Sequence, residues 1–169
     1  MSRVKDALSL FFREQKPIVD GGMHLVSFLS ARCANGQVEL AWPGIVVPSD
    51  AQDLWGACCG ARLFADVSYG QWGLVLLDPF SSAARTAQEK GIRPAEYRPD
   101  DMIVGEFLGD SDVVVLCPSE AGSRRVLIAP PLDPRDTWFA VGPELADLIT
   151  AFHDSNGEKF WVRPSAQMS

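Results

Sequence analysis

Three short apolar runs in the second half of the chain give its clearest pattern. They cover residues 102–107, 113–117 and 126–129, and each is rich in Val and Ile. Gly, Asp, Ser and Pro separate them, which is typical of consecutive antiparallel strands joined by tight turns. Residues 138–141 continue the series as a fourth strand. This stretch therefore predicts a sheet around which the rest of the chain is organised.

Two amphipathic helices are predicted near the ends of the chain, over residues 2–15 and 143–153. Ser2 can cap the first, and Pro143 suits the opening of the second because its missing N–H would have no partner there. Each helix has an apolar face at helical spacing, formed by Val4, Leu8, Phe11 and Phe12 in the first and by Leu145, Leu148, Ile149 and Phe152 in the second.

Two further helices are indicated by capping and stop signals. One follows Ser49 as its N-cap and is closed by Gly60. The other covers residues 83–90, with Ser82 as its cap and Gly91 as its stop, and its polar composition predicts a position on the surface.

Residues 23–34 fit two kinds of element. Leu25, Phe28, Leu29 and Cys33 have helical spacing, whereas His24, Val26 and Phe28 alternate as in a strand. We prefer the helix. Short strands are also predicted at residues 37–42 and 160–162, an edge strand at 62–67, and at 74–77 a strand buried on both faces, because its apolar residues are continuous.

Length and composition fit one globular domain. The chain has 169 residues, of which 47% are apolar and 22% charged, enough for a sizeable core. We predict a single α+β domain with a mixed or mostly antiparallel sheet flanked by helices. Residues 164–169 are expected to form a frayed tail.

The formal net charge of −7 bears on partners. Nucleic acid demands Lys and Arg, so it is a poor partner for this chain, whereas a basic protein is a good one. The alternative is that the acidity only keeps the protein soluble. We see no signal peptide and no run of the ~20 apolar residues that a membrane helix needs, so we expect a cytoplasmic protein.

The cysteines offer only a weak case for catalysis. None has the Cys-x-x-Cys spacing of a structural zinc site, so we expect no metal and no other cofactor. Cys59 with His153 or His24 could act as nucleophile and base in a small hydrolase. A cysteine on an apolar helix face belongs more often to the core. We therefore expect four reduced, mostly buried thiols: Cys33, Cys58, Cys59 and Cys117.

An acidic cluster around the central hairpin is one candidate binding surface for a basic protein partner. It consists of Asp100, Asp101, Glu106, Asp110 and Asp112. The alternative is that these are solvated turn residues, with the last two forming local side-chain hydrogen bonds.

Trp72 is a second candidate, because it lies in a glycine-rich turn and an exposed Trp can anchor an interface. The alternative is an aromatic side chain folded over the sheet, since large aromatic residues are usually mostly buried.

The order of motifs supports a family resemblance. Leu54-Trp55-Gly56 leads to Gly60, and Gly73-Leu74-Val75 follows. A strand then reaches Gly109-Asp110-Ser111-Asp112, and Trp138-Phe139-Ala140-Val141 opens the last strand and helix. Over residues 47–160 this order resembles the SUKH superfamily, which includes fungal cell-wall synthesis regulators and bacterial immunity proteins. Residues 1–46 would be an N-terminal helical extension.

The sequence departs from the family pattern at three places. Cys59 stands where Asn is usual, Gly142-Pro143 where Ser-Phe is usual, and Val47-Pro48 where Leu-Pro is usual. The resemblance implies one α+β domain without catalysis or cofactor. It also implies binding and neutralisation of a cognate secreted toxin, often a nuclease, in the cytosol. The alternative is a regulatory or scaffolding domain that binds a non-toxin partner.

Overall fold

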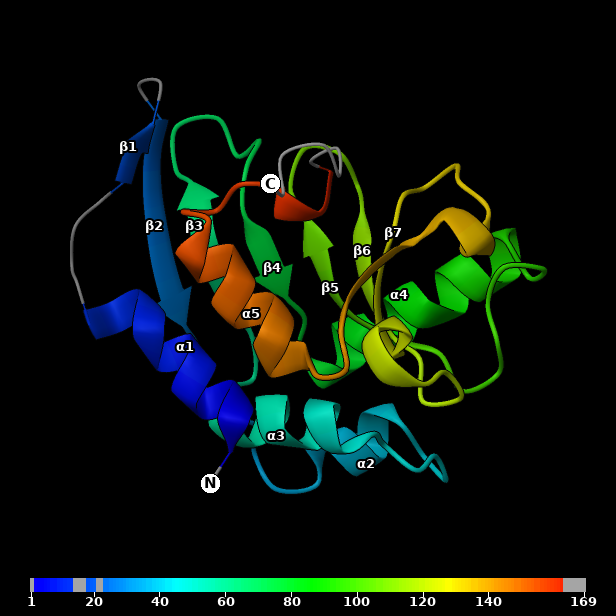
Figure 1. Cartoon of the computed structure of the whole chain (residues 1–169). Coiled ribbons are helices and arrows are strands. Elements are labelled where there is room, and N and C mark those ends of the chain that lie inside the picture. Colours follow the sequence, from blue (N-terminus) through cyan, green and yellow to red (C-terminus); the bar gives the residue numbers. More distant parts are fainter. Residues whose placement is uncertain (1, 14–17, 21–22, 163–169) are drawn as a thin grey trace.

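Eight antiparallel strands form one sheet, and their order across the sheet is their order in the chain (Figure 1). The computed structural model describes residues 2–13, 18–20 and 23–162. The predicted α+β class is confirmed, with an antiparallel sheet. The strands are β1 (Ile18–Asp20), β2 (Met23–Leu29), β3 (Ala61–Asp66), β4 (Leu74–Leu76), β5 (Met102–Phe107), β6 (Val113–Leu116), β7 (Val126–Ala129) and β8 (Phe139–Gly142).

Helices cover both faces of the sheet. In Figure 1, α1 and α5 cross in front of it, α2 and α3 lie along its lower end, and α4 lies behind β5 to β7. The helices are α1 (Arg3–Arg13), α2 (Gln37–Ala41), α3 (Ser49–Ala57), α4 (Pro79–Ile92) and α5 (Leu145–Asp154), with short 3₁₀ turns η1 (Gly122–Arg125), η2 (Arg135–Thr137) and η3 (Phe160–Val162).

The alternation of side chains along the central strands builds two apolar layers. Val114 packs with residues of α1, α3 and α5, while Val113 and Val115 face the opposite side of the sheet. Trp138 and Tyr97 complete that second layer. All four residues of β6 are buried, as expected for a strand covered on both faces.

Helix α4 meets the sheet through buried hydroxyl groups. The Ser82 hydroxyl donates to the carbonyl of Ile103, and the backbone N–H of Ile103 donates to Thr86 Oγ1 over 2.9 Å. The β4–β5 pairing does not extend to Ile103. The side chains of Ser82 and Thr86 therefore provide the hydrogen-bonding partners of its backbone carbonyl and N–H groups. The prediction that Ser82 caps this helix is wrong. The cap is Asp78, whose carboxylate accepts from the N–H groups of Phe80 and Ser81.

The structure corrects the predictions for residues 23–42. The preferred helix over 23–34 is wrong, because residues 23–29 form β2 and pair with β3. The predicted strand at 37–42 is wrong as well, because Gly36 adopts a φ of +84° and α2 starts immediately after it. Local spacing could not show that β3 would supply a hydrogen-bonding partner for β2.

Smaller corrections concern edges and ends. Strand β3 lies between β2 and β4, so it is not an edge strand. Pro48 rather than Ser49 precedes α3 as its cap residue, and residues 160–162 form a 3₁₀ turn instead of a strand. Helix α5 starts at Leu145, after Pro143, with Glu144 as its cap. The tail predicted at 164–169 lies outside the described residues. No helix in the described part of the chain is long and apolar enough to cross a membrane.

Candidate functional site

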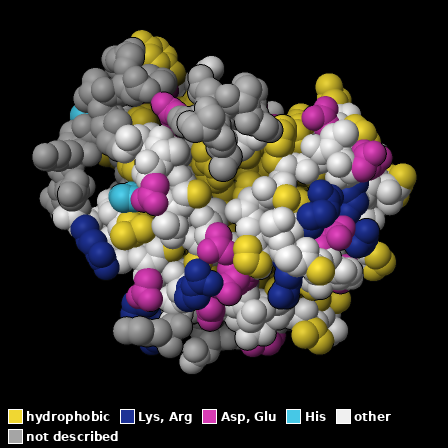
Figure 2. Space-filling model, viewed as in Figure 1, with side chains coloured by type: hydrophobic (Ala, Val, Ile, Leu, Met, Phe, Trp, Pro, Cys, Tyr) yellow, Lys and Arg dark blue, Asp and Glu magenta, His cyan; other side chains and the backbone are white. Residues whose placement is uncertain are grey.

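The five predicted carboxylates do not form one exposed patch. Asp101 is only 1% exposed, and Asp112 is buried too. Glu106 lies 3.6 Å from the guanidinium of Arg85, and Asp100, which is exposed, accepts from the hydroxyl of Ser119. Figure 2 shows acidic and basic side chains side by side on one face of the molecule. The structure therefore distributes this cluster over several internal pairings.

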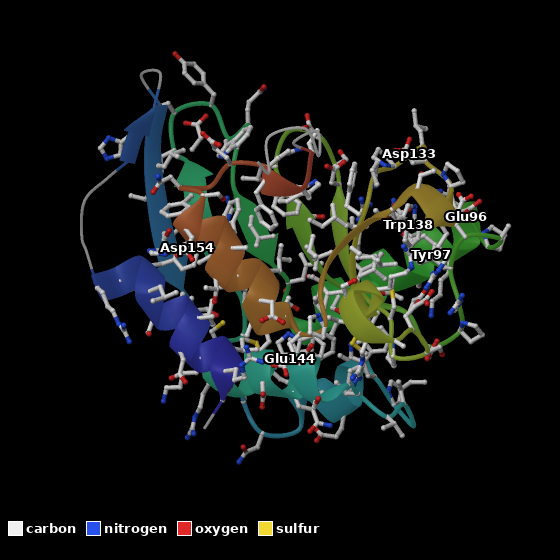
Figure 3. The ribbon with its side chains drawn as sticks, in the orientation of Figure 1. Glu96, Tyr97, Asp133, Trp138, Glu144 and Asp154 are labelled. Atoms are coloured by element: carbon white, nitrogen blue, oxygen red, sulfur yellow. A yellow bond between two sulfur atoms is a disulfide. The ribbon has the colours of Figure 1, made fainter. Side chains whose placement is uncertain are left out.

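Asp101 belongs to a buried ionic cluster around Arg135. Arg135 donates from Nη1 to Asp101 Oδ2 over 2.5 Å and to the Glu96 carbonyl over 2.9 Å. Its guanidinium carbon lies 5.2 Å from the ring centre of Trp138. Figure 3 shows Glu96 and Trp138 close together at the right of the view. Burial acts to lower the pKa of Arg135, but the hydrogen bond and charge of Asp101 outweigh it and raise that pKa. This arrangement joins loops to the sheet and leaves Asp101 no access to a partner.

Asp110 and Asp112 share the ammonium group of Lys159. Lys159 Nζ bonds to Asp110, and it lies 3.3 Å from Asp112 Oδ2. Burial raises the pKa of Asp112, and the nearby Lys159 opposes that rise. The hydrogen-bonding partner of both turn carboxylates is thus a side chain almost 50 residues further along the chain. Of the two, only Asp110 is exposed.

Trp72 lies partly buried against the core. Its indole Nε1 donates to the carbonyl of Gly157 over 2.8 Å, and its ring packs beside the main apolar cluster. This position matches an aromatic side chain folded over the sheet, tying the β3–β4 turn to the segment after α5.

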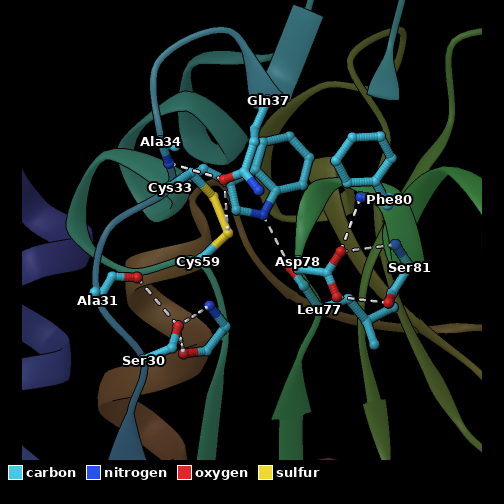
Figure 4. Close-up of a disulfide and its surroundings, with 12 residues drawn as sticks. Ser30, Ala31, Cys33, Ala34, Gln37, Cys59, Leu77, Asp78, Phe80 and Ser81 are labelled. Carbon is cyan, nitrogen blue, oxygen red and sulfur yellow. Dashed lines mark hydrogen bonds between the residues drawn. A yellow bond between two sulfur atoms is a disulfide. The ribbon is translucent and has the colours of Figure 1, made fainter. Parts of the chain in front are cut away.

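Cys33 and Cys59 form a disulfide with a Cα–Cα distance of 4.5 Å (Figure 4). The expectation of four reduced thiols is therefore wrong for these two, and the bond leaves Cys59 no free thiol to act as a nucleophile. Cys58 and Cys117 are free but buried, and burial raises both pKa values, that of Cys58 to about 11. A buried thiol with a raised pKa is a poor nucleophile.

Neither histidine of the chain has a catalytic partner among the described residues. His153 Nδ1 lies 3.1 Å from exposed Asp154, and its ring meets Phe11 edge-on and stacks on Phe64. No group of three or more His, Cys, Asp and Glu side chains in the described ranges is placed to hold a metal ion.

A hollow of about 530 Å³ opens between α3 and the segment before it. We call it the α2–α3 hollow. Trp55 is fixed at one wall by a 2.9 Å hydrogen bond from its Nε1 to the Leu77 carbonyl. Gln52 Nε2 holds the loop by donating to the Val47 carbonyl over 2.8 Å. The lining residues are Cys33, Ala34, Asn35, Gly36, Val38, Glu39, Trp42, Gly44, Ile45, Val46, Val47, Gln52, Trp55 and Gly56.

The lining of this hollow is mostly apolar and includes one charged residue. Val46 is 93% exposed, and Ile45 and Leu40 are also exposed. Glu39 is the one charged residue of the lining, and it forms no ion pair with any described residue. Three consecutive aliphatic residues after Pro43-Gly44, at 45–47, are the sequence signal for an apolar loop here, and the first two of them are exposed.

A second, polar hollow of about 280 Å³ lies where α1, α3 and α5 begin. Asp50 accepts from the N–H of Leu145 over 3.0 Å, and Glu144 and Asp147 bind Arg3. Burial, followed by the charge of Glu144, raises the pKa of Asp50 despite that hydrogen bond. These carboxylates stabilise the positive ends of helices, which gives them a structural role. Figure 3 shows Glu144 at the start of α5, close to α3.

Comparison of the chain with protein-family models and with curated proteins finds no match. The resemblance to the SUKH superfamily accordingly stays a prediction that rests on the motifs quoted above.

Proposed function

We propose that the chain is a non-catalytic protein-binding domain that neutralises a basic secreted toxin, of nuclease type, by forming a stoichiometric complex. The proposal places it in the cytoplasm of the producing cell. Opposite charge would steer the two proteins together and help the acidic chain to occupy a phosphate-binding groove.

The net charge of −7 carries this proposal. The fold uses most of its described basic side chains internally, either in ion pairs with carboxylates (Arg3, Arg85, Arg98, Arg135 and Lys159) or in hydrogen bonds to backbone carbonyls (Lys90, Arg93 and Arg124). Exposed carboxylates remain that form no ion pair with described residues, namely Asp6, Glu39, Asp53, Asp100 and Asp136. Exposed basic side chains without an ion pair to described residues also remain, namely Lys5, Arg13, Arg32, Arg62 and Arg125. The support for a basic partner is therefore the net charge of −7, and not a surplus of unpaired carboxylates.

The state of the thiols also favours binding over catalysis. Cys59, the candidate nucleophile, has Cys33 and Gln37 beside its sulfur and no histidine among its hydrogen-bonding partners in the described chain. Cys58 and Cys117 lie inside the core, away from solvent. These observations support a role that depends on surface complementarity.

Co-expression with the product of the neighbouring gene, tested for nuclease toxicity, tests the proposal. We expect rescue of growth and a one-to-one complex by light scattering, with an affinity that falls steeply as salt rises, because screening weakens the attraction. Failure to rescue growth together with no complex would contradict the immunity function. Recovery of a signalling or structural protein instead would favour the regulatory alternative.

The redox state of Cys33 and Cys59 in the producing cell gives an independent test of location. Cytoplasmic reductants keep most protein thiols reduced. Alkylation of intact cells followed by mass spectrometry should find both residues as thiols if the protein is cytoplasmic. A fully oxidised pair would argue for an oxidising compartment.

A further inference from the structure

We propose that the α2–α3 hollow binds an arginine side chain flanked by aliphatic residues, presented by an extended segment of a basic protein. The identity of that protein as a toxin rests on the proposed function. The preference of the hollow for this side chain rests on the lining residues themselves.

Charge complementarity selects the cation. Glu39 supplies the one charge in the lining and has no cationic partner among the described residues, so it can accept a guanidinium without breaking an existing pair. Trp42, the residue that ends α2, follows Glu39 by three positions, and both residues line the hollow. An indole beside a carboxylate suits a planar guanidinium, which stacks on one and donates two hydrogen bonds to the other.

Apolar surface selects the flanking residues. Val38, Ile45 and Val46 line the hollow, and Val46 is almost fully exposed. Exposed aliphatic side chains around a concave wall mark binding surfaces, because a partner that covers them removes apolar area from water. A segment with Leu or Val on each side of the arginine would cover this rim.

The far wall of the hollow is attached firmly enough to keep its shape. Backbone hydrogen bonds from Cys33 to the Trp55 carbonyl and from Cys59 to the Ala31 carbonyl tie the start of the segment to α3 whether or not the disulfide forms, and buried Val47 anchors its other end. Gly36 and Gly44 adopt positive φ values between these anchors, which fixes two sharp bends.

A peptide titration tests the preference without the toxin. Acetyl-Leu-Arg-Leu-amide is added to the full ¹⁵N-labelled chain, with acetyl-Leu-Gln-Leu-amide and acetyl-Leu-Glu-Leu-amide as matched probes. We expect saturable shifts at the amides of Glu39, Trp42 and Val46 with the arginine peptide, and at least about tenfold weaker binding of the other two. Equal binding of the glutamine peptide, shifts centred elsewhere, or no shift with any peptide would overturn the proposal.

Two glycines provide a matched pair of blocking variants. Gly56 and Gly91 are each the next-to-last residue of a helix, and a side chain at either meets open space, but only Gly56 lines the hollow. Both Gly56→Leu and Gly91→Leu should fold, because Leu favours a helix more than Gly does. Gly56→Leu should abolish binding of the arginine peptide, and Gly91→Leu should leave it unchanged. Equal binding by both variants would exclude the hollow as the site.

Glu39→Lys, with Asp136→Lys as control, tests the charge. The two residues are exposed and unpaired within the described chain, so each change alters the net charge equally. Only Glu39→Lys should weaken the arginine peptide about tenfold or more. If the peptide binds as expected but no toxin complex forms, the hollow stands and the proposed function fails. If a toxin complex forms and Gly56→Leu does not weaken it, the function stands and the hollow is not its interface.

Discussion

Arg135 holds Asp101 by two parallel hydrogen bonds, of 2.5 Å from Nη1 and 3.2 Å from Nη2, although 34 residues separate them in the chain. The side chain of Asp101 is fully buried and that of Arg135 is 12% exposed. The pair joins η2 to the residue before β5. Because both charges are withheld from water, each depends on the other for compensation.

Asp101→Asn should lower the free energy of unfolding by about 3–5 kcal/mol, because it leaves the guanidinium of Arg135 buried with its main counter-charge removed. Urea denaturation measures this change. Arg3→Ala is the control, since Arg3 pairs with Glu144 at an exposed site and should cost less than about 1 kcal/mol. Similar losses for the two variants would show that the buried pair is not special.

The disulfide should contribute roughly 3 kcal/mol to stability, because it closes a loop across 26 positions of the chain and so restricts the unfolded state. Dithiothreitol should lower the urea midpoint of the wild-type protein. It should leave unchanged a variant that combines Cys33→Ser with Cys59→Ser. An equal response of both proteins to reductant would mean that the pair is not bonded in solution.

Asp78 makes stability depend on pH. Burial acts to raise its pKa, but hydrogen bonds from the Ser81 hydroxyl and from the N–H groups of Ser81 and Phe80 outweigh it and lower the pKa. A lowered pKa in the folded state means that the stabilisation is present above the unfolded pKa and is lost as pH falls through the folded value. Asp78→Ala should cost about 1 kcal/mol at pH 6 and less at pH 2.

Asp78→Asn serves as the control for that experiment. Asn also caps helices well, and it does not titrate, so its effect should vary little with pH at this position. Unfolding curves at several pH values would separate the two variants. A cost of Asp78→Ala that stays constant down to pH 2 would contradict the role of the carboxylate charge.

Gly109→Ala should destabilise the β5–β6 turn strongly. Gly109 has a φ of +97°, and a Cβ there would overlap the carbonyl oxygen of Gln71. The unfavourable positive φ and the overlap with the Gln71 carbonyl should together lower the free energy of unfolding by at least about 2 kcal/mol. Gly91→Ala, in open space on α4, should instead gain roughly 0.5–1 kcal/mol. Thermal unfolding of the two alanine variants should shift the melting temperature in opposite directions.

Local sequence was informative where turn chemistry fixes the chain. The expected strands at 102–107 and 126–129 match β5 and β7 residue for residue, because β-branched runs there are bounded by Gly, Asp and Pro. Local sequence was insufficient at 23–42. Whether 23–29 forms a strand depends on β3, which is remote in sequence.

The pairing of the candidate site residues could not be predicted from the sequence for the same reason. The burial of Asp101 requires Arg135, and the bond of Cys59 requires Cys33. Both partners lie more than 25 residues away, and no spacing rule relates them. Composition predicted an acidic surface, but only the folded chain shows which carboxylates remain unpaired.

The order of the strands has a consequence for how the protein can diversify. Since every strand pairs with its neighbours in the chain, the connection between β2 and β3, which contains α2 and the aliphatic loop, crosses no other connection in the sheet. The part of this connection that precedes α3, residues 34–46, can change in length and sequence without altering a single strand pairing. The proposed recognition surface and the scaffold are thereby encoded in separable stretches, so a new partner could be acquired by changing residues 34–46 while the sheet and the buried face of α3 stay intact.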